Sequence, residues 1–112
     1  LKGDIYFSQN KNKLAEKNYS LAIDKASYRK ERFLIKRAQF FFDTKKYQLA
    51  LKDFRSSRQL NKNYSKAWLG EVNSYVKLNN KNGAKKALTE YTKLKPNSKI
   101  ISSLKSEINE LK

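Results

Sequence analysis

The chain repeats a pattern of small and large apolar residues about every 34 positions. In each unit an alanine is followed four positions later by a large apolar or aromatic residue. The pairs are Ala15 with Tyr19, Ala50 with Phe54, and Ala84 with Leu88, and an aromatic column of similar spacing runs through Tyr6, Phe41 and Tyr75. This period predicts stacked supersecondary units, because one unit alone cannot bury its apolar face. Such proteins usually present a surface, so the repeat favours binding over catalysis.

Apolar residues spaced three or four positions apart predict an all-α chain of about seven helices. The expected helices are Leu1–Gln9, Lys11–Ala26, Arg29–Asp43, Lys46–Leu60, Ser65–Lys77, Asn82–Leu94 and Ser98–Leu111. The breaks between them contain asparagine, glycine and the single proline, which are typical of turns. We expect the side chains of Thr44, Ser65 and Ser98 to cap helix starts by accepting backbone N–H bonds.

Three units in register resemble the tetratricopeptide repeat family. In the third unit, the family's Trp, Tyr, Ala, Phe and Pro positions are occupied by Trp68, Tyr75, Ala84, Leu88 and Pro96. The matching residues in the other two units are Leu34, Ala38, Phe41, Ala50 and Phe54, and Gly3, Tyr6, Ala15, Tyr19 and Ala22. The resemblance implies one domain over 1–112, folded as a right-handed α-solenoid of stacked helix-turn-helix repeats. The implied repeats are about 1–28, 29–63 and 64–97, followed by a capping helix at 98–111 that could also bind a partner. The register further predicts that about five residues of the first helix precede Leu1, so that the chain is a fragment or a processed product.

In the family that this chain resembles, the first helix of each hairpin lines a concave groove that holds peptides or helices. The implied groove positions are Asp4, Phe7, Ser8, Arg32, Ile35, Lys36, Gln39, Phe42, Asp43, Lys66, Leu69, Gly70, Asn73, Val76 and Lys77. We take ten of them as the candidate partner-binding residues: Phe7, Arg32, Ile35, Lys36, Gln39, Phe42, Lys66, Leu69, Asn73 and Val76. Apolar members would supply burial, and amide groups could pair with a peptide backbone. Alternatively, the apolar members pack between helices, or the groove holds another part of the parent chain.

A subclass of the family clamps a C-terminal carboxylate with two lysines, two asparagines and an arginine. In this chain, Asp4 and Lys36 replace the two asparagines, Gly70 replaces the arginine, and only Lys66 agrees. The resemblance therefore implies that the carboxylate tails of Hsp70 and Hsp90 are not ligands. Arg37 and Glu71 stand at one column where the family prefers leucine, and we expect them to form an ion pair across the repeat interface. The alternative is two side chains that extend to solvent with little mutual energy.

The chain carries a net charge of +16, from 26 basic and 10 acidic residues. This charge keeps a second function open, a basic module that binds an anionic surface of nucleic acid or acidic membrane. Lysine supplies 21 of the basic residues and asparagine occurs 11 times, a pairing that compositional drift explains equally well. With only five arginines, the chain has few of the planar groups favoured in phosphate recognition, so nucleic acid is the weaker of the two anionic partners.

The chain has no cysteine and no histidine. Thiol catalysis, Cys/His zinc sites and a Ser–His–Asp triad are therefore excluded within it, and no carboxylates pair as an acid–base dyad. We predict no catalytic residue, no metal site and no cofactor. The expected function is a non-enzymatic scaffold or adaptor that binds a peptide or helix of a partner protein. The compartment stays open between cytoplasm and a bacterial periplasm or membrane surface.

Overall fold

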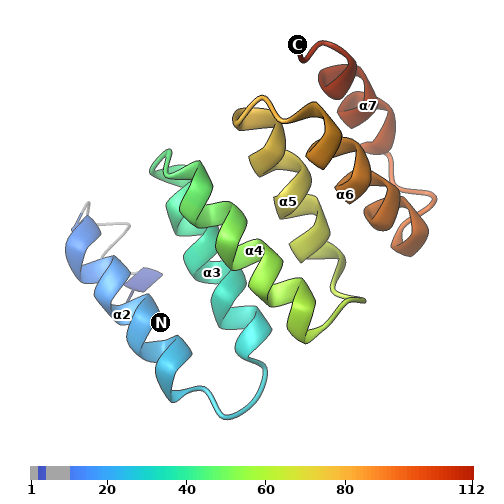
Figure 1. The fold of residues 1–112 in the computed structure, drawn as a ribbon. Helices are drawn as coiled ribbons and strands as arrows, with labels where there is room; N and C mark the ends of the chain where they lie inside the picture. Colours follow the sequence, from blue (N-terminus) through green and yellow to red (C-terminus); the bar gives the residue numbers. More distant parts are fainter. Residues whose placement is uncertain (1–2, 5–10) are drawn as a thin grey trace.

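The computed structural model describes residues 3–4 and 11–112. Gly3 and Asp4 are helical, and the rest of the helix expected at Leu1–Gln9 lies outside the described residues. The other helices, in chain order, are α2 Asn12–Lys25, α3 Lys30–Asp43, α4 Tyr47–Leu60, α5 Ser65–Lys77, α6 Lys81–Leu94 and α7 Ile101–Asn109. No strand occurs in the described ranges. The all-helical solenoid predicted from the repeat is therefore confirmed, and Figure 1 shows its helices following one another from α2 to α7.

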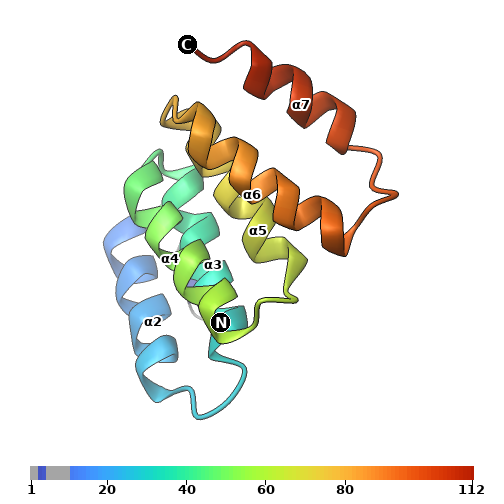
Figure 2. The same ribbon diagram turned by 45° about the vertical axis from the view of Figure 1, so that its right-hand side comes forward.

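Neighbouring helices pack as a continuous row. The helices α3 and α4 form one hairpin, α5 and α6 form the next, and α4 packs against α5 to join them. At the two ends of the row, α2 packs on α3 and α7 packs on α6. Figure 2 shows that α7 lies along the outer side of α6, at the opposite end of the row from α2. The division into repeats at 1–28, 29–63 and 64–97 stays a prediction.

The core consists of two clusters that follow the repeat. The α2–α4 cluster contains Ala15, Tyr19, Ala38, Phe40, Phe41, Ala50 and Phe54. The α5–α7 cluster contains Val72, Ala84, Ala87, Leu88, Tyr91, Leu104 and Ile108. The repeated alanines at 15, 50 and 84 are each 0% exposed, and a small side chain at these positions lets neighbouring helices approach closely. The large residues of the same pairs fill the space beside the alanines, as interiors packed at native density require.

The three predicted N-cap residues do not cap helix starts in the structure. Thr44 does not cap the start of α4; its hydroxyl donates to the carbonyl oxygen of Phe40 at 2.9 Å, at the end of α3. Ser98 shares a 2.9 Å hydrogen bond with the Tyr91 hydroxyl, and α7 begins three residues later. Ser65 is the first residue of α5 and caps nothing. At the start of α6, the side chain of Asn80 accepts a hydrogen bond from the backbone of Gly83 at 2.9 Å.

Candidate functional site

Predicted groove residues from two helices meet at a small pocket. Gln39 and Phe42 line it from α3, Gly70 and Asn73 line it from α5, and Phe54 lines it from α4. The pocket measures about 60 Å³. This volume accommodates one small side chain, since a single water molecule occupies about 30 Å³ of liquid. The structure thus brings three of the candidate residues, those at positions 39, 42 and 73, around one opening.

Gly70 allows α5 to approach the ring of Phe54. A Cβ atom placed on Gly70 would lie 2.2 Å from Cδ1 of that ring, well inside any permitted contact. The ring is 3% exposed and belongs to the α2–α4 cluster, so its neighbours hold it in place. The glycine at this groove position therefore has a steric reason, because any side chain there would displace a core aromatic residue.

The apolar candidates are half-buried. Ile35 and Phe42 pack against the α2–α4 cluster, and Leu69 and Val76 pack against the α5–α7 cluster. The ring of Phe42 also meets that of Tyr47 edge-on, with centroids 5.2 Å apart. Part of each side chain is thus engaged in helix packing, and part remains at the surface. Such residues offer anchored apolar contacts, because the helices hold them before any ligand arrives.

The polar candidates differ in what they already contact. Gln39 donates from Nε2 to Oδ1 of Asp43 at 2.8 Å. Arg32 and Lys66 are exposed, and their side chains form no hydrogen bond or ion pair with any other described residue. Asn73 is half-buried at the small pocket. Two exposed cations therefore accompany the amide groups of Gln39 and Asn73 along α3 and α5.

An acidic side chain from the first unit neutralises one of the predicted groove cations. Lys36 donates from Nζ to Oδ2 of Asp4 at 3.2 Å, and the hydroxyl of Tyr19 donates to Oδ1 at 2.6 Å. Partial burial raises the pKa of Asp4, but the hydrogen bonds from Tyr19 and Lys36 outweigh it and leave that pKa below its ordinary value. Burial and the bond to Asp4 raise the pKa of Tyr19. Two predicted groove positions of the same unit, Phe7 and Ser8, lie outside the described residues.

The predicted ion pair between Arg37 and Glu71 is wrong. Arg37 instead donates from Nε and Nη2 to both carboxylate oxygens of Asp53, at 2.7 and 2.9 Å, and from Nη1 to Ser20 at 3.1 Å. Glu71 accepts a 2.8 Å hydrogen bond from Nε of Arg58. Both Asp53 and Arg58 lie on α4, which packs against α3 and against α5. Each member of the expected pair therefore meets an opposite charge on the helix that it packs against.

The buried carboxyl of Glu71 makes stability depend on pH in a particular direction. Burial raises its pKa above 4.5, and the hydrogen bond and charge of Arg58 oppose that rise only in part. The folded state therefore binds more protons than the unfolded state between the two pKa values. This contribution to stability is fully present below about pH 4.5 and declines as the pH rises through the folded pKa.

The Glu71→Gln variant isolates this effect, because glutamine does not titrate. We expect the unfolding free energy of the wild type, relative to that of the variant, to decrease between about pH 4 and about pH 7. Urea denaturation followed by circular dichroism at several pH values measures the difference. A difference that instead increases over this range would mean that the ion pair with Arg58 outweighs burial.

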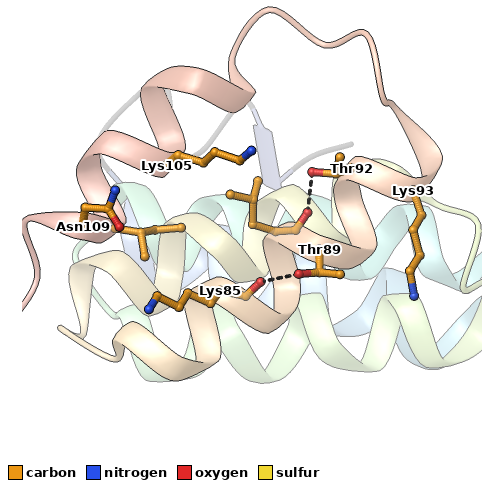
Figure 3. Close-up of a pocket in the computed structure, with 8 residues that line it drawn as sticks. Lys85, Thr89, Thr92, Lys93, Lys105 and Asn109 are labelled. Carbon is orange, nitrogen blue, oxygen red and sulfur yellow. Dashed lines mark hydrogen bonds between the residues drawn. The ribbon is translucent and has the colours of Figure 1, made fainter.

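A larger cavity was not predicted from the sequence. It measures about 560 Å³ and lies between α6 and α7, where Thr89 and Thr92 border it (Figure 3). The available signal was two threonines, Thr89 and Thr92, three positions apart and near lysines in the sequence of α6. Among the described residues, no three side chains of Asp, Glu, His or Cys gather as metal ligands would. Within the same residues, no helix has the length and apolarity that a membrane span needs.

Comparisons with known proteins give one family and two close structural matches. Residues 41–108 match the profile of the family described as Tetratricopeptide repeat. The first TPR of Spaghetti (RPAP3), bound to the HSP90 peptide SRMEEVD, has a TM-score of 0.85 and 28% sequence identity over 97% of this chain and 86% of its own. The second TPR domain of human RPAP3, in complex with the HSP70 peptide SGPTIEEVD, has a TM-score of 0.85 and 25% identity over 97% of this chain and 90% of its own. No curated protein matches the chain significantly.

Proposed function

This chain belongs to the tetratricopeptide repeat family, and we propose that it is a non-enzymatic interaction module whose concave groove binds a segment of a partner protein. The proposal rests on one observation, the pocket at which Gln39 and Asn73 flank the half-buried ring of Phe42. Amide groups beside an anchored aromatic ring suit a peptide, because they pair with its backbone while the ring packs on a side chain. The two structural neighbours, each bound to a peptide, support this kind of partner.

The groove chemistry favours an internal segment over a C-terminal carboxylate. Asp4 places a negative charge beside Lys36, and Gly70 leaves no cation at its position. A terminal carboxylate would therefore meet an existing carboxylate, and like charges held close together cost binding energy. We propose that the tails bound by the structural neighbours are not the ligands of this chain. The exposed Arg32 would instead pair with an acidic side chain of the bound segment.

The peptides SRMEEVD and SGPTIEEVD test this exclusion directly. We expect both to bind more weakly than about 1 mM at physiological salt, as judged by fluorescence anisotropy. A control peptide has the same composition and net charge, but its last four residues are in scrambled order. Its binding measures the contribution of the overall positive charge of the protein. Tight binding of either natural tail, and not of its scrambled control, would contradict the exclusion.

The groove itself is tested with the variant Phe42→Ala/Arg32→Ala. In pull-downs at about 0.3 M salt, which suppresses nonspecific charge attraction, we expect its partner to be retained at least about tenfold less than by the wild type. The matched control is Leu49→Ala/Arg55→Ala, which removes the same kinds of group from exposed positions of α4. Circular dichroism confirms folding of both variants. Equal retention by both variants would exclude the groove assignment.

The second candidate function is binding to an anionic surface, which the net charge of +16 favours. It predicts that affinity for nucleic acid or acidic vesicles falls steeply with salt. Recovery of nucleic acid or lipid alone, and only at low salt, would support this function in place of the groove.

A further inference from the structure

The cavity between α6 and α7 has an apolar lining. Leu88 and Ile108 border it from the two helices, together with Thr89 and Thr92. The hydroxyl of Thr89 donates to the carbonyl oxygen of Lys85 at 3.0 Å, and that of Thr92 donates to Leu88 at 2.8 Å, as the dashed lines in Figure 3 show. Because each hydroxyl proton is engaged on its own helix, the threonines offer mainly their methyl groups to a ligand.

The rim of the same cavity is cationic. Lys85 borders it from α6 and Lys105 from α7, and Figure 3 shows Lys105 extending toward the side of α6 that carries Thr92. A third lysine, Lys93, pairs with Glu90 at 2.8 Å. None of the described residues that line the cavity is acidic. An occupant with carboxylates at its edges would therefore find two lysines without a competing partner.

The repeat indicates what shape of occupant fits. Lys105 and Asn109 on α7 stand 34 positions after Glu71 and Tyr75 on α5. Those two α5 residues share a small cavity with α6, and a Cβ atom on Gly83 of α6 would lie 2.6 Å from the Tyr75 ring. Glu71, between α4 and α6, is 1% exposed, whereas Lys105 is exposed. The cavity beside α7 thus corresponds to the place that a helix covers one unit earlier.

Contacts at both ends of the cavity join α6 to α7 and to the loop between them. Lys81, at the start of α6, donates from Nζ to the backbone oxygen of Asn109 at 3.4 Å, near the end of α7. At the other end, the hydroxyl of Tyr91 bonds that of Ser98 in the connecting loop. The buried side chains of Leu104 and Ile108 fix α7 between these two contacts. A site whose helices are fixed before binding loses less conformational entropy when the ligand arrives.

We propose that the cavity between α6 and α7 docks an acidic amphipathic helix of a partner protein, with its apolar face over the methyl groups of Thr89 and Thr92 and the largely buried Leu88 and Ile108 beneath them, and its carboxylates at Lys85 and Lys105. Charge complementarity selects this occupant. A second copy of the chain is disfavoured, because each copy carries a net charge of +16. Single-stranded nucleic acid is disfavoured as well, because no aromatic ring on which a base could stack lines the described cavity.

The probe for this site can be built from the chain itself. It is a synthetic peptide with the α6 sequence, residues 81–94, in which the lysines at 81, 85, 86 and 93 are replaced by glutamate. A staple on its polar face keeps this short peptide helical in isolation, where it would otherwise be largely unfolded. The control peptide has the same staple and the native lysines. By fluorescence anisotropy, we expect the acidic peptide to bind and the basic peptide not to bind.

Variants of the protein locate the site. We expect Lys85→Glu/Lys105→Glu to weaken binding of the acidic peptide by at least about tenfold, because two attractive contacts become repulsive. The matched control, Lys17→Glu/Lys25→Glu on α2, changes the net charge equally and should weaken binding by no more than about twofold. Thr89→Gln, which places a longer side chain at the cavity, should also weaken binding. The groove variant Phe42→Ala should leave this binding unchanged, so the two proposals can fail independently.

Three outcomes would overturn the proposal. The first is no measurable binding of the acidic peptide. The second is an equal loss of affinity in the cavity variant and the α2 control variant, which would assign binding to the overall charge. The third is a single-stranded oligonucleotide of equal charge that binds at the same lysines as tightly as the peptide, which would assign the site to nucleic acid.

Discussion

Replacing Phe54 with alanine is expected to lower the unfolding free energy by about 3–5 kcal/mol. The ring is 3% exposed, and it joins the α2–α4 cluster to the face of α5 that carries Gly70. Its removal both loses buried apolar surface and leaves a cavity that the surrounding helices cannot fully close. Urea denaturation followed by circular dichroism measures the change. A loss below about 1 kcal/mol would mean that the two hairpins repack around the vacancy.

The close contact between Phe54 and Gly70 allows a sharper version of this test. In the wild type, Gly70→Ala is expected to cost about 1–3 kcal/mol, because the new methyl group displaces the ring. In the Phe54→Ala background, the same change should be neutral or stabilising, since alanine favours a helix by about 1 kcal/mol over glycine. The sign of the Gly70→Ala effect should therefore depend on residue 54. Additive effects in the double-mutant cycle would show that the ring moves freely.

The second large effect concerns the buried ion pair between α3 and α4. Replacing Arg37 with methionine should cost about 3–5 kcal/mol, because it leaves the carboxylate of Asp53 buried without a partner. The Asp53 side chain is 4% exposed and accepts two hydrogen bonds from that guanidinium. The variant also loses the contact with Ser20, which joins α2 to this pair. The same urea denaturation measures the cost.

A double variant distinguishes the contribution of the Arg37–Asp53 ion pair to stability from the contribution of side-chain packing. Arg37→Met/Asp53→Leu removes both charges and keeps apolar volume between the helices, so most of the lost stability should return. A double variant as unstable as Arg37→Met would mean that the guanidinium contributes mainly through its packing and its contact with Ser20. Full recovery would mean that the wild-type pair gives little net stability and that its role lies in selecting which helices meet.

The helices and the alanine columns could be predicted because both depend on short-range pattern. A residue such as Ala50 repeats at a fixed period, and every unit meets the same neighbours, so its environment follows from its position. The last residues of α3 through α6 and the first residue of α5 were predicted correctly, whereas the starts of α3, α4 and α6 each differ by one residue from the prediction. The candidate groove came from the family resemblance and stays a prediction, although its residues at 39, 42 and 73 meet at one pocket.

Features that depend on the choice among nearby partners could not be predicted. Thr44 could reach either the start of α4 or the end of α3, and its hydroxyl donates to the carbonyl oxygen of Phe40, in the last turn of α3. Arg37 and Glu71 occupy one repeat position, but the sequence pattern does not show that each prefers an oppositely charged partner on α4, Asp53 or Arg58, to the other. The steric role of Gly70 depends on a ring 16 positions earlier on another helix, which the local sequence does not reveal.

The opposite charges at positions 37 and 71 favour one order of the hairpins over the other. Arg37 follows a helix that carries Asp24, whose charge it feels, and Glu71 follows a helix that carries Arg58. If the two hairpins exchanged places, Glu71 would follow α2 and meet Asp24 in place of Arg58, so a buried carboxylate would face a like charge. Hairpins that share one fold are thus not interchangeable, and a chain that pairs them in the wrong sequence is penalised as it folds. The charges at the interface between the hairpins thus match the native neighbouring helix and not the alternative one.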